Sequence, residues 1–68
     1  MTMRVNSRVM TPNGPGIVQG RLVEDGETRI IVSHNPNEPG VADAVRERFL
    51  HGIWVLWNYS VDDLIEIS

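Results

Sequence analysis

Clusters of turn-forming residues divide this 68-residue chain into short pieces. The first is the run Thr-Pro-Asn-Gly-Pro-Gly at residues 11–16, in which proline presets φ while glycine and asparagine tolerate positive φ. The second is the Asp25-Gly26 pair, a common hairpin turn. The third, residues 34–40, holds two prolines and a glycine among polar residues. We expect a tight loop at the first cluster, a hairpin at the second and a longer loop at the third.

Five segments around these turns have the composition of short β-strands. They are residues 5–10, 17–23, 28–32, 53–59 and 65–67. In the second segment, alternation places Val18, Gly20 and Leu22 on one face, and the internal glycine predicts a bulge or bend. The fourth is aromatic and β-branched throughout, so both of its faces are expected to be covered. Five strands in so short a chain predict one all-β domain, residues 1–68, closed into a small barrel.

Two further segments have helical features. Val41, Val45 and Phe49 share one face at helical spacing, which predicts a short amphipathic helix over residues 41–50, between the third and fourth strands. This face either covers the open end of the barrel, which is the favoured interpretation, or packs against a second copy of the chain or a partner. Ser60 is expected to cap a single helical turn before the last strand.

Composition narrows the environment and the partners. The chain has no cysteine, so it has neither disulfides nor thiolate metal ligands, and we expect a cytoplasmic location. It has no apolar run of the roughly 18 residues that span a membrane, and no signal-peptide pattern. The net charge of −3 disfavours nonspecific binding to nucleic acid or anionic lipid, and so favours a protein partner.

The order of motifs resembles that of small SH3-like barrels. The resemblance lies in residues 9–18, in the Asp25-Gly26 hairpin and in residues 63–67, and it covers about two thirds of the chain. Such barrels include the Tudor-like C-terminal domains of bacterial repair helicases, the polymerase-binding domain of CarD-type regulators and KOW-type modules. The resemblance implies a five-stranded SH3-like barrel with a short helical excursion between strands three and four. The excursion is longer than the corresponding loop of those families.

The strongest candidates for binding are aromatic and basic side chains. Trp54, Trp57 and Tyr59 have polar tips suited to protein hot spots or to base stacking, and alternation places Trp54 on the face opposite the other two. Three arginines on neighbouring strands could form a positive face that contacts phosphate or acidic peptide. The full set of candidate binding residues is Trp54, Trp57, Tyr59, Arg8, Arg21, Arg29, Phe49 and His51.

Catalysis and cofactor binding have little support in the sequence. The only candidate bases at neutral pH are His34 and His51, and no nucleophile lies at a spacing that would pair with them. The two histidines with Asp43 are too far apart in sequence to indicate a metal site. We therefore expect no enzyme activity, no cofactor and no metal.

These features lead to a non-catalytic binding module as the expected function. The leading hypothesis is a cytoplasmic adaptor or accessory factor that binds a protein of the nucleic-acid machinery, such as a transcription or DNA-repair component, in a bacterium or phage. One alternative is direct binding of nucleic acid, and another is a small-ligand-binding or anti-defence protein. A homodimer is also considered, because so small a core gains stability from association.

Overall fold

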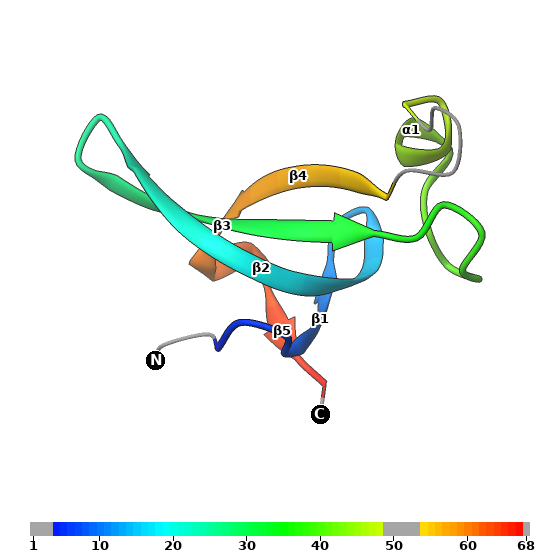
Figure 1. Cartoon of the computed structure of the whole chain (residues 1–68), viewed down its shortest axis with the longest axis horizontal. Helices are drawn as coiled ribbons and strands as arrows, with labels where there is room; N and C mark the ends of the chain where they lie inside the picture. The colour runs from blue at the N-terminus through cyan, green and yellow to red at the C-terminus, as the bar shows by residue number, and fades with distance from the viewer. Residues whose placement is uncertain (1–3, 49–53, 68) are drawn as a thin grey trace.

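The computed structural model describes residues 4–48 and 54–67, and they form one antiparallel sheet with a short α-helix and a 3-10 turn beside it (Figure 1). In chain order the elements are β1 (Arg8–Thr11), β2 (Gly14–Glu24), β3 (Glu27–His34), α1 (Asp43–Arg46), β4 (Val55–Ser60), the 3-10 turn η1 (Val61–Asp63) and β5 (Ile65–Glu66). The strand order in the sheet is β4-β3-β2-β1-β5. The predicted all-β class is confirmed.

The turns follow the sequence in one place and depart from it in another. Asp25 and Gly26 both adopt positive φ, 52° and 78°, as a two-residue hairpin between β2 and β3 requires. The loop predicted at residues 11–16 is wrong in its second half, because Gly14–Gly16 already belong to β2 and pair with β1. Glycine allows this close packing because it has no side chain: a Cβ added to Gly16 would lie 2.9 Å from the carbonyl oxygen of Ser33.

A β-bulge in β2 changes which face of the sheet the later side chains of the strand occupy. The register with β3 shifts between Val18 and Gly20, which leaves Gln19 as the extra residue. Val18 pairs with Val32 on the inner face, whereas Leu22 pairs with Arg29 on the outer face. The bulge predicted near Gly20 is present, but the prediction that Val18, Gly20 and Leu22 share a face is wrong, because alternation restarts after the bulge.

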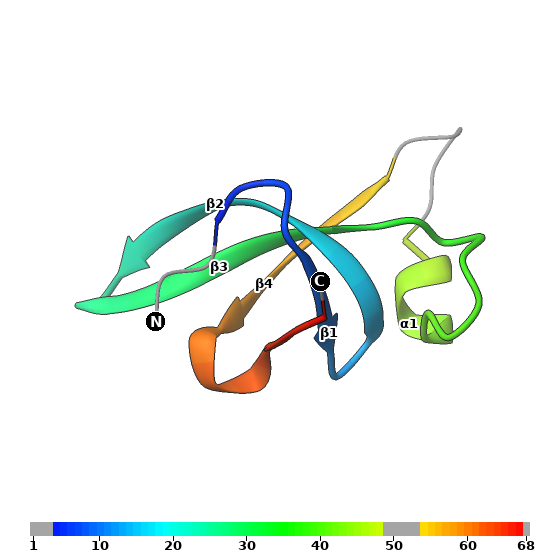
Figure 2. The ribbon, with the colours of Figure 1, turned by 90° about the horizontal axis from the view of Figure 1, so that it is seen from below.

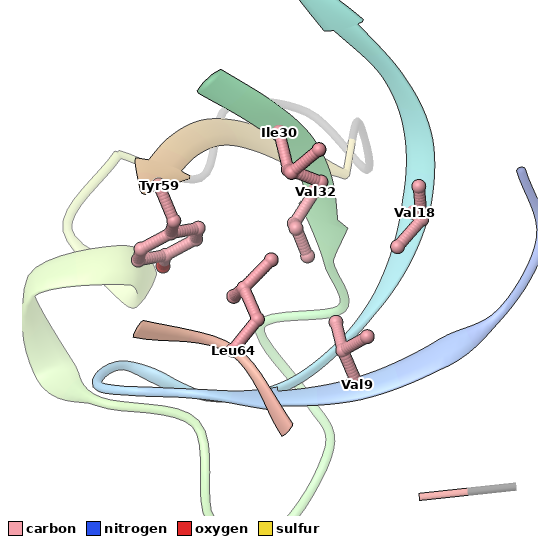
Figure 3. Close-up of a cluster of buried hydrophobic side chains, with 6 residues drawn as sticks. All are labelled: Val9, Val18, Ile30, Val32, Tyr59 and Leu64. Carbon is pink, nitrogen blue, oxygen red and sulfur yellow. The ribbon is translucent and has the colours of Figure 1, made fainter. Parts of the chain in front are cut away.

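The core lies inside the curl of the sheet. Six buried side chains from four strands and from the residue after η1 point toward one another (Figure 3): Val9, Val18, Ile30, Val32, Tyr59 and Leu64. A second cluster of Val41, Val45 and Val55 joins the first through the half-buried Trp57. The loop and helical turn after β3 therefore cover one end of the core, as the lid interpretation predicts.

The helical features are shorter than predicted, and the sheet remains open. The helix predicted over residues 41–50 is only the four-residue α1. Phe49, which was expected on its apolar face, lies outside the described residues. Ser60 caps η1, with its Oγ accepting a bond from the Asp62 amide at 3.4 Å, so that prediction is confirmed. Figure 2 shows the curl of the sheet, yet among the described residues no ladder joins β4 to β5, and a closed barrel is not shown.

None of the helices in the described part of the chain has the length and apolarity needed to cross a membrane.

Candidate functional site

The aromatic strand divides its side chains between core and surface. Tyr59 pairs with Ile30 and Trp57 pairs with Val32, so both face the core, and Tyr59 is buried. Trp54, just before β4, is 44% exposed. The alternation in the sequence therefore separates the aromatic residues correctly. Trp54 is partly exposed on the surface, while Trp57 joins the two core clusters.

Trp57 also carries a cation on its open side. The guanidinium carbon of Arg48 lies 4.3 Å from the centroid of the Trp57 ring, a cation–π contact. Arg48 is itself exposed. This arrangement presents a fixed positive charge beside β4.

The three candidate arginines do not share one face. Arg8 forms an ion pair with Glu38 at 3.0 Å, and Arg29 forms one with Glu27 at 3.2 Å. Arg21 pairs with Ile30 on the inner side of the hairpin, because the bulge has turned it away from the side that Arg29 occupies. The structure therefore brings together no positive surface from these three residues. The other two candidates, Phe49 and His51, lie outside the described residues.

A shallow apolar hollow lies on the outer face of the sheet, where the sequence indicated no site. It has a volume of about 220 Å³ and is lined by Leu22, Ile31, Leu56 and Asn58, which lie on the outer face, and by Trp57, which lies between Leu56 and Asn58 in β4 and faces the core. Leu56 is 61% exposed, which contradicts the expectation that both faces of this strand are covered within the chain. Gly20 pairs with Ile31 and adds no side chain there, so the middle of the outer face stays low.

The bulge builds this hollow. Without the extra residue, alternation from Val18 would keep Leu22 on the core side, and the outer face would carry Arg21 in its place. With the bulge, Leu22, Ile31 and Leu56 from three adjacent strands lie on the same side of the sheet. A short apolar run in β4 is the only sequence signal for it, and that run also fits a fully buried strand.

A buried network of hydrogen-bonded polar side chains on the core side was also not predicted. His34 has no exposed surface; its Nδ1 lies 2.8 Å from the Pro15 carbonyl oxygen and its Nε2 lies 2.7 Å from the Tyr59 hydroxyl. The Asn13 side-chain amide donates to the same hydroxyl at 2.9 Å. Since a carbonyl only accepts, Nδ1 must carry the proton, and Tyr59 then donates to Nε2. The neutral imidazole on β3 thus ties β2 to β4, and Asn13 links the β1–β2 turn to β4 through the same hydroxyl.

Burial favours the neutral form of this histidine. Desolvation lowers the pKa of His34, against the opposing effects of the Pro15 carbonyl and, more weakly, the Glu38 carboxylate. A protonated ring would donate from both nitrogens, and the Tyr59 oxygen would then have to accept from His34 and Asn13 together. With both ring nitrogens occupied and no exposed surface, His34 serves the fold.

We expect this histidine to make stability depend on pH. Because its pKa is lowered on folding, the unfolded chain binds more protons as pH falls through about 6.5, the ordinary histidine value. The free energy of unfolding therefore falls as pH drops through that value, until the ring titrates in the folded state. Urea denaturation at several pH values between about 7.5 and 5.5 measures this slope.

The control is His34→Gln, whose side chain does not titrate. Its free energy of unfolding should vary less steeply over the same pH interval. Equal slopes for the two proteins would contradict the assignment.

Among residues 4–48 and 54–67, no three His, Cys, Asp or Glu side chains come together as a candidate metal site. Comparison of the chain with protein-family models, with curated proteins and with solved structures finds no match.

Proposed function

We propose that this chain is a non-catalytic, protein-binding module whose contact surface is the apolar hollow on the outer face of the sheet. The observation that carries the proposal is the exposure of Leu56 at the edge of a hollow that also contains Leu22 and Ile31. Exposed apolar side chains gathered on one surface favour a protein partner, because burying them removes apolar area from water. Asn58 and the side chain of Arg29 supply polar groups beside it.

The strand order supports an SH3-like module. β5, β1, β2, β3 and β4 are neighbours in that order, and a 3-10 turn separates β4 from β5. This arrangement matches the connectivity of the small barrels that the sequence resembles. The resemblance supplies the class of partner that we propose, a cytoplasmic component of the transcription or DNA-repair machinery.

Two observations favour protein over nucleic acid. The net charge is −3, and Arg8, Arg21 and Arg29 are dispersed, with two of them paired to carboxylates. A phosphate backbone requires a continuous positive surface, whereas an apolar hollow does not bind it. The hollow, at about 220 Å³, is also smaller than the roughly 300–1,000 Å³ of typical small-ligand pockets, so a side chain of a protein partner is the better fit.

Leu56→Lys should abolish this binding without unfolding the protein. A charge at a 61% exposed position changes stability little, by about 0.5 kcal/mol, but it cannot be buried against an apolar partner. A crosslinking pull-down from a bacterial lysate compares the proteins captured by the wild type with those captured by this variant. At least one protein should be retained by the wild type alone.

The matched control is Val23→Lys, at a 71% exposed position near the hairpin tip and outside the hollow. It should capture the same proteins as the wild type. Identical capture by all three proteins would contradict the proposal. So would a saturable change of tryptophan fluorescence with oligonucleotides that high salt abolishes, since that result would favour nucleic acid.

A further inference from the structure

The two edges of the sheet are protected to different degrees. β5 is one edge, and it has only two residues, one of them Glu66. β4 is the other edge, with six residues, and among the described residues it pairs with β3 alone. Proteins usually protect edge strands by shortness, charge, proline or a bulge.

β4 has none of these protections. Its sequence, Val-Leu-Trp-Asn-Tyr-Ser, contains no charged residue and no proline, and its register with β3 runs without a shift from Arg29–Ser60 to His34–Val55. Such an uncharged, aromatic edge offers backbone donors and acceptors to another strand, although the Asn58 carbonyl oxygen already accepts a bond from Arg29 Nη2 at 3.5 Å.

We propose that β4 binds the partner as an added strand, an extended segment of alternating apolar and acidic residues. This inference rests on the proposed protein-binding function and specifies its mode. Backbone hydrogen bonds to the outer edge of β4 would supply affinity, and side chains on the two faces of the added strand would supply specificity.

The outer face of the sheet explains why every second residue of the added strand is expected to be apolar. Alternate residues of an added strand lie on the same side as Leu56 and Asn58 of β4. That side leads directly into the hollow formed with Leu22 and Ile31. An apolar side chain at these positions removes the exposed surface of Leu56 from water.

The inner face of the sheet explains why the residues between them are expected to be acidic. Residues of the added strand between the apolar ones lie beside Trp57, and the Arg48 guanidinium is stacked on that ring. Arg8, Arg29 and Arg46 each pair with a carboxylate, whereas Arg48 forms no ion pair with any residue that the structure describes. A carboxylate from the added strand would satisfy Arg48 in a fixed position.

A second copy of the chain fits this site less well. The residues of β4 that face outward are Leu56, Asn58 and Ser60, so a copy paired through β4 would bring two polar side chains of three toward the hollow. β4 also has no acidic residue to offer Arg48. Both features favour a segment of a different protein.

The test uses a capped nine-residue peptide of alternating valine and glutamate, titrated into the ¹⁵N-labelled full chain. Amide shifts should saturate and be largest across Val55–Ser60. A peptide N-methylated at every second residue, on the edge that pairs, should bind at least about tenfold more weakly, because it cannot form the ladder. A valine–lysine peptide should be weakened similarly, since it repels Arg48.

Arg48→Gln provides the matched variant, because Arg48 is exposed and makes no ion pair with the described residues. It should weaken binding of the valine–glutamate peptide and remove the preference over the valine–lysine peptide. Absence of binding, equal binding of the N-methylated peptide, or shifts centred on β5 would overturn the added-strand mode. A concentration-dependent dimer with β4 amides protected from exchange would overturn it in favour of a second copy. If Leu56→Lys still loses its captured protein in any of these cases, the binding function stands and only the mode fails.

Discussion

Replacing Gly14 by alanine should destabilise the protein by about 3–5 kcal/mol. Gly14 has a φ of 110°, in the region that L side chains rarely adopt, and an added Cβ would clash with the Gly40 carbonyl oxygen and lie 2.8 Å from the Val41 Cα. Both obstacles are backbone, and Ala42 anchors this segment by donating its amide to the Asn13 carbonyl at 2.8 Å. A chain of this size has a free energy of unfolding of about 3–10 kcal/mol, so much of the variant should be unfolded.

The matched control for this change is Gly20→Ala, in the same strand. Nothing lies within 4 Å of a Cβ added at Gly20, so this variant should be as stable as the wild type or about 0.5 kcal/mol more stable. Urea or thermal unfolding followed by circular dichroism compares the three proteins. Equal stability of the Gly14 variant and the wild type would show that the loop at residues 35–42 moves aside without loss of packing.

Features that depend on neighbouring residues were predictable from the sequence. The Asp25-Gly26 turn needs only two residues with positive φ, and the Ser60 cap needs only an oxygen within two residues of an orphan amide. The placement of Trp54 and Tyr59 on opposite faces follows from simple alternation, although only the structure shows which of the two is buried. Each of these is settled by local stereochemistry, which a single sequence contains.

The faces of β2 were not predictable, because one extra residue changes them all. Gly20 indicates a bulge in this strand, but composition alone does not say which residue is extra or how many pairs precede it. With Gln19 as the extra residue, Arg21 moves to the inner side and Leu22 to the outer. The same shift disperses the expected arginine surface and creates the apolar hollow, so both errors about the site have one cause.

The buried network of hydrogen-bonded polar side chains could not be predicted from the sequence for a different reason. His34 begins a polar loop in the sequence, and its partners Pro15 and Tyr59 lie 19 and 25 residues away, while Asn13 lies 46 residues from Tyr59. No local pattern joins residues so far apart. Only the antiparallel pairing of β3 with both β2 and β4 brings them together.

Tyr59→Phe should lower the free energy of unfolding by about 2–3 kcal/mol, although it keeps the aromatic ring in the core. The change removes one hydroxyl that serves two groups, the buried Nε2 of His34 and the side-chain amide of Asn13. A buried polar group that loses its partner costs about 1–3 kcal/mol, and Asn13, only half-buried, can still reach water. Thermal unfolding should show a fall in Tm of about 10–20 °C for a domain of this size.

A double-mutant cycle separates this hydrogen bond from general packing. His34→Leu removes the ring whose Nε2 the Tyr59 hydroxyl satisfies, so in the combined variant that nitrogen is no longer left without a partner. The double variant should therefore be more stable than the sum of the two single changes predicts, by about 1–2 kcal/mol. Strictly additive losses would mean that the 2.7 Å contact adds nothing to the fold, and the β1–β2 turn would then be joined to β4 by the Asn13–Tyr59 bond and by apolar packing.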